Sequence, residues 1–174
     1  MRVLFLFLLT ANVCIGQHNV KTEKTVLSIH NYVKSVDNLT LDAAFEINKR
    51  VTKAAELLEK KVAISLLDAS GTVILLSRAD GVGPHNTEAA RRKAYTALST
   101  KTATLSLLRN AAINPDTKNL NTLPELLLLS GGIPIWYNGN IIGSIGVAGG
   151  GSPENDDLIA RSAAIPELGI TTTK

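Results

Sequence analysis

The sequence has very little cysteine, and that shortage excludes several kinds of site. Cys14 is the single cysteine among 174 residues, so no internal disulfide can form. Four-cysteine zinc sites, iron–sulfur clusters and paired-cysteine redox motifs need more thiolates than the chain contains. Histidine is scarce as well, because His18, His30 and His85 are its only imidazole groups.

Aromatic residues and an excess of one charge are also lacking. Aromatic residues make up 4% of the chain, so Leu, Ile, Val and Ala must fill the core. Eighteen Lys and Arg against fifteen Asp and Glu give a formal net charge of +3. No basic run is interleaved with aromatic residues, so nucleic acid is not the expected partner. With 45% hydrophobic and 19% charged residues, the composition indicates one folded domain.

The longest apolar run stands at the N-terminus. A short positive start, Met1-Arg2, precedes the unbroken apolar residues 3–9. This pattern predicts a secretory signal peptide over residues 1–16, too short and too interrupted for a membrane span. Lipidation of Cys14 is a second option, although Val13 is not the small residue that lipid attachment favours. A secreted or periplasmic mature chain without cysteine suits an oxidising compartment.

Hydrophobic periodicity divides the remainder into an N-terminal arm at residues 17–39, a domain at residues 40–166 and a C-terminal tail at residues 167–174. A helix is expected from Thr40 to about residue 60, and its apolar face is expected to comprise Leu41, Ala44, Phe45, Val51, Ala55 and Leu58. The elements expected after it are strands 62–67 and 72–77, helices 86–98 and 100–109, a loop over 110–123, strands 133–137 and 141–148, and a helix from 153 to 164.

Each of the two pairs of neighbouring strands is predicted to form a hairpin. Asn138-Gly139 is the strongest turn signal, because a type I′ turn requires positive φ at both central residues. Hairpins imply an antiparallel sheet, which argues against a doubly wound nucleotide-binding fold. The expected fold class is therefore α+β, with one antiparallel sheet flanked by helices.

His85 is the most informative polar residue. No G-x-S-x-G elbow is present, and His18 and His30 lie in the arm, where solvated side chains are expected. His85 follows Gly83-Pro84 at the start of a predicted helix that also carries Glu88. It could ligate a metal or a haem iron, or it could be a loop histidine that caps the helix.

Basic residues gather near His85. Arg78, Arg91, Arg92 and Lys93 are candidates to bind a carboxylate, although neighbouring helix positions spread around the axis and cannot form a single clamp. Tyr95 could stack on a ligand, ligate iron or lie in the core.

Glycines cluster in and after the last predicted strand. Gly143 and Gly146 lie inside that strand, where they mark the close approach of a ligand or of another backbone. The run 149–151 is either an anion cradle or a flexible strand exit.

Several segments together resemble the GlcG/HbpS-type haem-binding family, which is related to the C-terminal domain of PduO-type corrinoid adenosyltransferases. The most specific are K-A-Y-T-A at residues 93–97, S-G-G-I-P-I at residues 130–135 and G-S-I-G-V-A-G-G at residues 143–150. Ala148 departs from the serine common at its position. The resemblance implies a profilin-like antiparallel sheet of about five strands and a homo-oligomer.

The resemblance also implies a secreted haem- or tetrapyrrole-binding protein without catalysis of its own, with a corrinoid as the alternative ligand. His85 is the expected metal ligand. The expected cofactor-binding residues are His85, Arg78, Arg92, Lys93, Tyr95, Thr96, Gly131, Gly132, Gly143 and Gly146. Two alternatives stay open: a protein acting on a small organic acid, with His85 as base and Arg78 as carboxylate clamp, and a ligand-free oligomeric scaffold.

Overall fold

The computed structural model describes residue 29 and residues 32–174. The predicted signal peptide and most of the predicted arm lie outside the described residues. The chain divides into two compact units, Met1–Lys34 and Ser35–Lys174, and the whole sheet lies in the second. None of the described helices is both long and apolar enough to cross a membrane.

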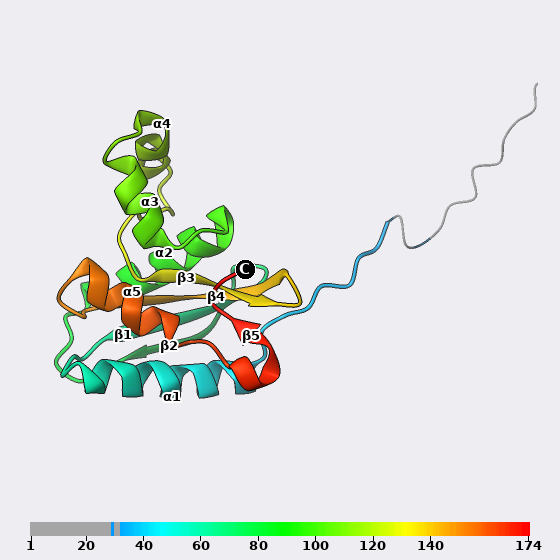
Figure 1. The fold of residues 1–174 in the computed structure, drawn as a ribbon, viewed down its shortest axis with the longest axis horizontal. Helices are drawn as coiled ribbons and strands as arrows, with labels where there is room; N and C mark the ends of the chain where they lie inside the picture. Colours follow the sequence, from blue (N-terminus) through cyan, green and yellow to red (C-terminus); the bar gives the residue numbers. More distant parts are fainter. Residues whose placement is uncertain (1–28, 30–31) are drawn as a thin grey trace, which may run out of the picture. The chain divides into compact units, whose positions relative to one another are not determined.

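Five antiparallel strands form one sheet in the order β2-β1-β4-β3-β5 (Figure 1). Their bounds are β1 Ala63–Asp68, β2 Val73–Arg78, β3 Gly132–Tyr137, β4 Asn140–Ala148 and β5 Ile170–Thr171. Both predicted hairpins are present, β1 with β2 and β3 with β4. The predicted α+β class, one antiparallel sheet flanked by helices, is confirmed.

The helices cover both faces of the sheet. Their bounds are α1 Leu41–Leu57, α2 His85–Thr100, α3 Thr104–Ala111, α4 Pro115–Lys118 and α5 Pro153–Arg161. The main hydrophobic cluster joins buried residues of α1 and α5 to one face, through side chains such as Ile64, Leu66 and Ile145. On the other face, α2 packs against β4, β1 and β3.

The start of α1 follows the sequence pattern, but its buried face differs from the expected one. The Thr40 hydroxyl caps the helix by accepting a hydrogen bond from the backbone amide of Ala43 at 3.2 Å. The buried positions are Ala44, Ile47, Val51 and Ala55. Leu41 and Phe45 were expected on that face and are instead 49% and 58% exposed. The buried face of α1 is therefore narrower than the apolar face that the sequence pattern predicted.

The turns of the two hairpins have different causes. Asn138 and Gly139 have φ values of 48° and 75°, so both central residues of the β3–β4 turn have the predicted positive φ. In the β1–β2 turn, the Asp68 carboxylate accepts hydrogen bonds from the amides of Ser70 and Thr72, both at 2.9 Å. One hairpin is therefore shaped by backbone conformation and the other by a side chain.

The segment expected as a loop over residues 110–123 is partly helical. Asn114 caps α4 by accepting from the amide of Asp116 at 2.9 Å, and Pro115 occupies the first turn. A 3₁₀ helix, η2, follows at Asn119–Thr122. Pro115 is well placed in a first helical turn, where no amide donor is required. Together α3 and α4 project from the layers of sheet and helix (Figure 1).

The C-terminal residues, expected as a tail, contribute to the fold. After α5 a short 3₁₀ helix, η3 Pro166–Leu168, leads into β5, which pairs with the end of β3. Arg50 on α1 donates to the Glu167 carboxylate and to the carbonyl oxygen of Ala164. These contacts connect the C-terminal segment to α1.

Candidate functional site

Three glycines singled out in the sequence lie against the backbone of a neighbouring element. A Cβ atom on Gly146 would collide with the carbonyl oxygen of Ala90 in α2, and one on Gly132 would collide with that of Lys93. A Cβ on Gly143 would meet the carbonyl oxygen of Leu67 in β1. Of the two options left open for Gly143 and Gly146, the structure places another backbone against both.

Lys93 is buried and already paired. Its side chain is 5% exposed, and its Nζ donates to the carbonyl oxygen of Val147 at 2.9 Å and to Asp156 Oδ2 at 2.8 Å. Asp156 Oδ1 in turn accepts from the amide of Gly150 at 2.7 Å. A carboxylate from the chain itself therefore binds the glycine run that was considered as an anion cradle. Gly131 packs against the same carboxylate residue, since a Cβ there would lie 2.8 Å from the Asp156 Cβ.

Thr96 is also fully engaged within the chain. It is completely buried, and its hydroxyl donates to the carbonyl oxygen of Arg92 at 2.7 Å and accepts from the amide of Leu127 at 2.8 Å. The Leu127 contact fixes the segment before β3 against α2. Lys93, Thr96, Gly131 and Gly132 thus position α2 and its neighbours, and their binding roles stay predictions.

His85 is the exposed first residue of α2. Its imidazole packs over Gly83, where an added Cβ would lie 2.9 Å from the ring. Glu88 pairs with Arg91 rather than with His85, and this pairing lowers the pKa of the Glu88 carboxyl. Among the described residues, no group of three or more His, Cys, Asp or Glu side chains could hold a metal ion. His85 therefore stands as a single potential ligand.

Tyr95 lines a cavity of about 480 Å³ between α2 and the segment that follows η2. We call it the Tyr95 cavity; it is lined by Tyr95, Ser99, Thr100, Leu120, Leu123, Pro124, Glu125 and Leu126. Half of these residues have apolar side chains, namely Leu120, Leu123, Pro124 and Leu126. The Tyr95 phenol, two hydroxyls and one carboxylate are the polar groups available to a ligand.

Two arginines of α2 hold the wall of the Tyr95 cavity in place. Arg91 forms ion pairs with Glu88 at 2.7 Å and with Glu125 at 2.8 Å. Arg92 donates to the carbonyl oxygen of Leu126 at 2.8 Å, while its buried Nε has no partner among the described residues. Both cations therefore lie beside the cavity, and one of them retains an unused donor.

The predicted site residues separate into two groups along α2. Tyr95 follows His85 by ten positions, which corresponds to about 15 Å along a helix. One ligand atom cannot contact both side chains. Arg92 belongs with Tyr95, whereas His85 lies at the opposite end of the helix.

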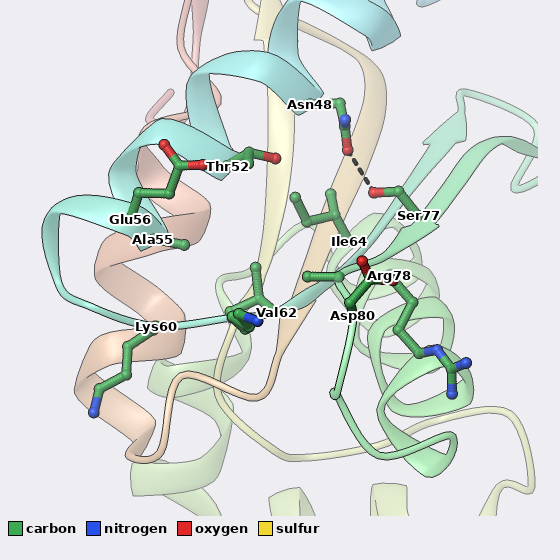
Figure 2. A pocket seen from close by; sticks show the side chains of 12 residues that line it. Asn48, Thr52, Ala55, Glu56, Lys60, Val62, Ile64, Ser77, Arg78 and Asp80 are labelled. Carbon is green, nitrogen blue, oxygen red and sulfur yellow. Dashed lines mark hydrogen bonds between the residues drawn. The ribbon is translucent and has the colours of Figure 1, made fainter.

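A second cavity, of about 460 Å³, lies on the other face of the sheet. We call it the α1 cavity; Figure 2 shows it between the C-terminal half of α1, the start of β1 and the end of β2. Arg78 lines it together with Lys60 and Lys61. His85 is not among its lining residues. Ser77 faces α1 through its bond to Asn48, and Figure 2 shows the guanidinium of the next residue, Arg78, directed away from the floor of the cavity.

Several residues that shape these cavities had no distinct signal in the sequence. Neither Asp156 nor Glu125 was singled out as a site residue. In the sequence, Lys60 and Lys61 have the pattern of solvent-exposed residues at the end of a helix. Their relevance depends on segments that are distant in the chain, so only periodicity combined with a correct topology could have found them.

The comparisons with known proteins agree with the fold. A family model described as haem degrading protein HbpS-like matches residues 39–165. A crystal structure of a double mutant of HbpS from Streptomyces reticuli is 32% identical, with a TM-score of 0.70, and the match covers 76% of this chain and 88% of that one. A crystal structure of a PduOC–heme complex is 28% identical, with a TM-score of 0.68, over 79% of this chain and 99% of that one.

A similarity also extends to part of a larger enzyme. The corrinoid adenosyltransferase PduO of Citrobacter freundii is 30% identical over 130 residues, which are 72% of this chain and 38% of PduO. The chain therefore spans well under half of that relative. The similarity concerns one part of PduO and does not extend to its full length.

Proposed function

This chain belongs to the HbpS-like family, and from that premise we propose that it binds haem in the Tyr95 cavity. The observation that carries the proposal is an apolar cavity beside a tyrosine and two arginines on one helix. Ligand sites of several hundred Å³ with apolar walls and a few polar groups are typical of small-molecule binding. The similarity to the PduOC–heme complex supports the choice of haem.

The residues present fit the chemistry of a haem. Leu120, Leu123 and Leu126 supply apolar walls for a flat macrocycle. Tyr95 supplies a phenol oxygen, a known type of axial ligand to haem iron. Arg92, whose Nε has no partner among the described residues, supplies a guanidinium group of the kind that pairs with carboxylates such as propionates.

The chain's own residues would act mainly by positioning and by excluding water. The ion pair of Arg91 with Glu125 and the hydrogen bond from Arg92 to Leu126 hold the leucine wall against α2. The buried contact between Thr96 and Leu127 continues this wall toward β3. Bound haem would supply an iron centre able to coordinate a small ligand or to exchange an electron.

The proposal is tested by titrating haemin into the purified full chain and following the Soret band. Wild type is expected to saturate at one haem per chain. Tyr95→Phe is expected to shift the band and to weaken binding at least tenfold, because the phenyl ring keeps the packing but removes the oxygen ligand. Tyr137→Phe, at an exposed tyrosine of β3, is the matched control and should behave as wild type.

His85 provides the competing assignment of the iron ligand. His85→Ala should leave the Soret band and the affinity unchanged if Tyr95 is the ligand. If His85→Ala changes the spectrum and Tyr95→Phe does not, His85 is the ligand and the Tyr95 cavity is the wrong site. If the wild-type chain does not bind haemin but binds a corrinoid, the alternative tetrapyrrole replaces haem.

We further propose binding without turnover, in an exported form of the chain. A Soret band that persists with reductant and oxygen would support binding alone, whereas its decay with release of iron would assign haem degradation. Export is proposed from residues 1–16, which lie outside the described residues. The intact mass of the exported chain should correspond to a start near Gln17, and retention of Met1 would contradict export by cleavage.

A further inference from the structure

We propose that the β1–β2 turn, residues 69–72, is a positioning element of the haem site, and that Gly71 sets the place of the Tyr95 ring. This inference rests on the proposed function and gives a role to a segment that does not line the Tyr95 cavity. A Cβ atom added to Gly71 would lie 3.3 Å from Tyr95 Cε2 and 3.6 Å from Leu98 Cδ2. The turn therefore packs against α2 at the proposed iron ligand.

The Tyr95 side chain depends on packing for its position. Its hydroxyl forms no hydrogen bond with any residue in the range 35–174. Metal-ligating side chains are commonly oriented by a hydrogen bond to a second group, and the described chain supplies none to this phenol. Contacts on the ring must therefore orient it. The buried cluster of Leu107, Leu126 and Leu128 provides some of them, and Gly71 provides the others from the turn.

The β1–β2 turn is itself held firmly in place. The Asp68 carboxylate accepts hydrogen bonds from the amides of Ser70 and Thr72, both at 2.9 Å, and from the Ser70 hydroxyl at 2.6 Å. Asn38 Oδ1 accepts from the amide of Ala69 at 2.7 Å, which fastens the turn to the segment before α1. A turn fixed by several hydrogen bonds can hold an aromatic ring at one place.

Glycine at position 71 meets two separate requirements. Its φ of 87° lies in the left-handed region that glycine favours. It also leaves room for the ring, because a methyl group 3.3 Å from Tyr95 Cε2 would be closer than the optimal carbon–carbon separation of about 3.5–4.0 Å. Gly81 meets only the first requirement, since its φ is 84° and nothing lies within 4 Å of an added Cβ. The two glycines together separate backbone strain from the contact with Tyr95.

The test is titration of haemin into the full chain carrying Gly71→Ala or Gly81→Ala. Gly71→Ala is expected to shift the Soret maximum and to weaken haemin binding about fivefold, because groups that bind a ligand must be held to within about 0.5 Å. Gly81→Ala should keep the wild-type spectrum and affinity. Circular dichroism checks that both variants are folded. A wild-type spectrum and affinity in Gly71→Ala, or an equal loss in Gly81→Ala, would overturn the proposal.

A double variant separates positioning of the ligand from support of the fold. In a Tyr95→Phe background, Gly71→Ala should weaken haemin binding by less than about twofold, since the oxygen that it misplaces is already absent. Asp68→Ala keeps Gly71 but removes the acceptor that shapes the turn, and its effect should depend on the Tyr95 oxygen in the same way. Equal effects with and without that oxygen would show that the turn only supports the fold.

The inference and the proposed function fail separately. Carbon-13 spectra of the haem-free chain labelled at tyrosine report on the Tyr95 ring, whose signals are those lost in Tyr95→Phe. Gly71→Ala should shift these signals and Gly81→Ala should not, and unshifted signals in Gly71→Ala would overturn the inference even where haem binds. If Tyr95→Phe binds haemin as the wild type does, the proposed function fails, and the same spectra still decide whether the turn holds the ring.

Discussion

The two faces of the sheet are packed in opposite ways. Toward α1 and α5 the strands present large aliphatic side chains, including Ile64, Leu66 and Ile145. Toward α2 they present small residues, and Ala63 and Ala148 meet Ala90 directly. Since side chains alternate along a strand, the same strands form both surfaces. One face is a conventional hydrocarbon core, and on the other the helix backbone nearly touches the sheet.

This difference has consequences for function. Because α2 lies so close to the sheet and is held by the buried Lys93–Asp156 pair, its outward residues, including Tyr95 and Arg91, have a rigid support. The face toward α1 is filled by long side chains and leaves the α1 cavity at one end. Rigid support suits the placement of an iron ligand.

The largest expected effect comes from breaking the buried ion pair under α2. Lys93→Ala leaves the Asp156 carboxylate buried without its cation, which should lower the free energy of unfolding by about 3–5 kcal/mol. Chemical denaturation measures this loss. Arg109→Ala removes an exposed pair with Glu154 and should change stability by about 0–1 kcal/mol. Similar losses in both variants would mean that Lys93 does not anchor α2.

The close approach of α2 can be tested at Gly146. Gly146→Ala places a methyl group against the carbonyl oxygen of Ala90, and we expect a loss of about 3 kcal/mol from overpacking. Gly81→Ala is the control, because nothing lies within 4 Å of an added Cβ there. Its φ of 84° should cost about 1–2 kcal/mol. A Gly146 variant no less stable than the Gly81 variant would contradict the packing described for α2.

The aliphatic face should tolerate a small change of volume much better. Ile145→Val removes one buried methyl group from the main cluster and should lower the free energy of unfolding by about 0.5–1.5 kcal/mol. Thermal and chemical denaturation of this variant and of Gly146→Ala compare neighbouring residues on opposite faces of β4. Equal losses of unfolding free energy in the two variants would mean that the two faces of the sheet tolerate changes of side-chain volume equally.

The smallest expected effect concerns the ion pair between Arg50 of α1 and Glu167 of the C-terminal segment, which we call the C-terminal clamp. A hydrogen bond from its own backbone amide and one from Arg50 hold the pKa of the Glu167 carboxyl below its usual range. Its contribution to stability is therefore complete above the pKa of the unfolded chain and is lost as pH falls through the lower pKa of the folded chain. Glu167→Gln should slightly reduce the dependence of Tm on pH in that acidic range. An identical pH dependence in variant and wild type would exclude a role for this clamp.

Local features of the fold could be predicted because they depend on neighbouring residues. Thr40 and Ser152 cap two of the expected helices through local hydrogen bonds, and Asn138-Gly139 forms the expected turn. Leu41 and Phe45 were placed wrongly on the buried face of α1. Their apolar character fits the helical period, but the width of the buried stripe depends on how closely the sheet approaches.

The residues of the candidate site could be predicted from the sequence, but which of them lie near one another could not. Arg78, His85, Arg92 and Tyr95 were all singled out, and the structure places Tyr95 in the wall of a cavity, Arg92 beside that wall and His85 at the exposed start of α2. This grouping could not come from the sequence, because it depends on which segments lie across from α2. Hydrophobic patterns specify a helix far better than they specify its neighbours.

The sequence by itself determined the order of helices and hairpins and the antiparallel sheet, because caps, turn residues and periodicity act over a few residues. Only the tertiary structure decided that, of three consecutive basic residues, Lys93 turns inward to Asp156 while Arg91 and Arg92 hold the wall of a cavity. Successive helix residues point about 100° apart. Which of them is buried is therefore settled by the backbone that the helix meets, and here that backbone is brought close by Gly132 and Gly146.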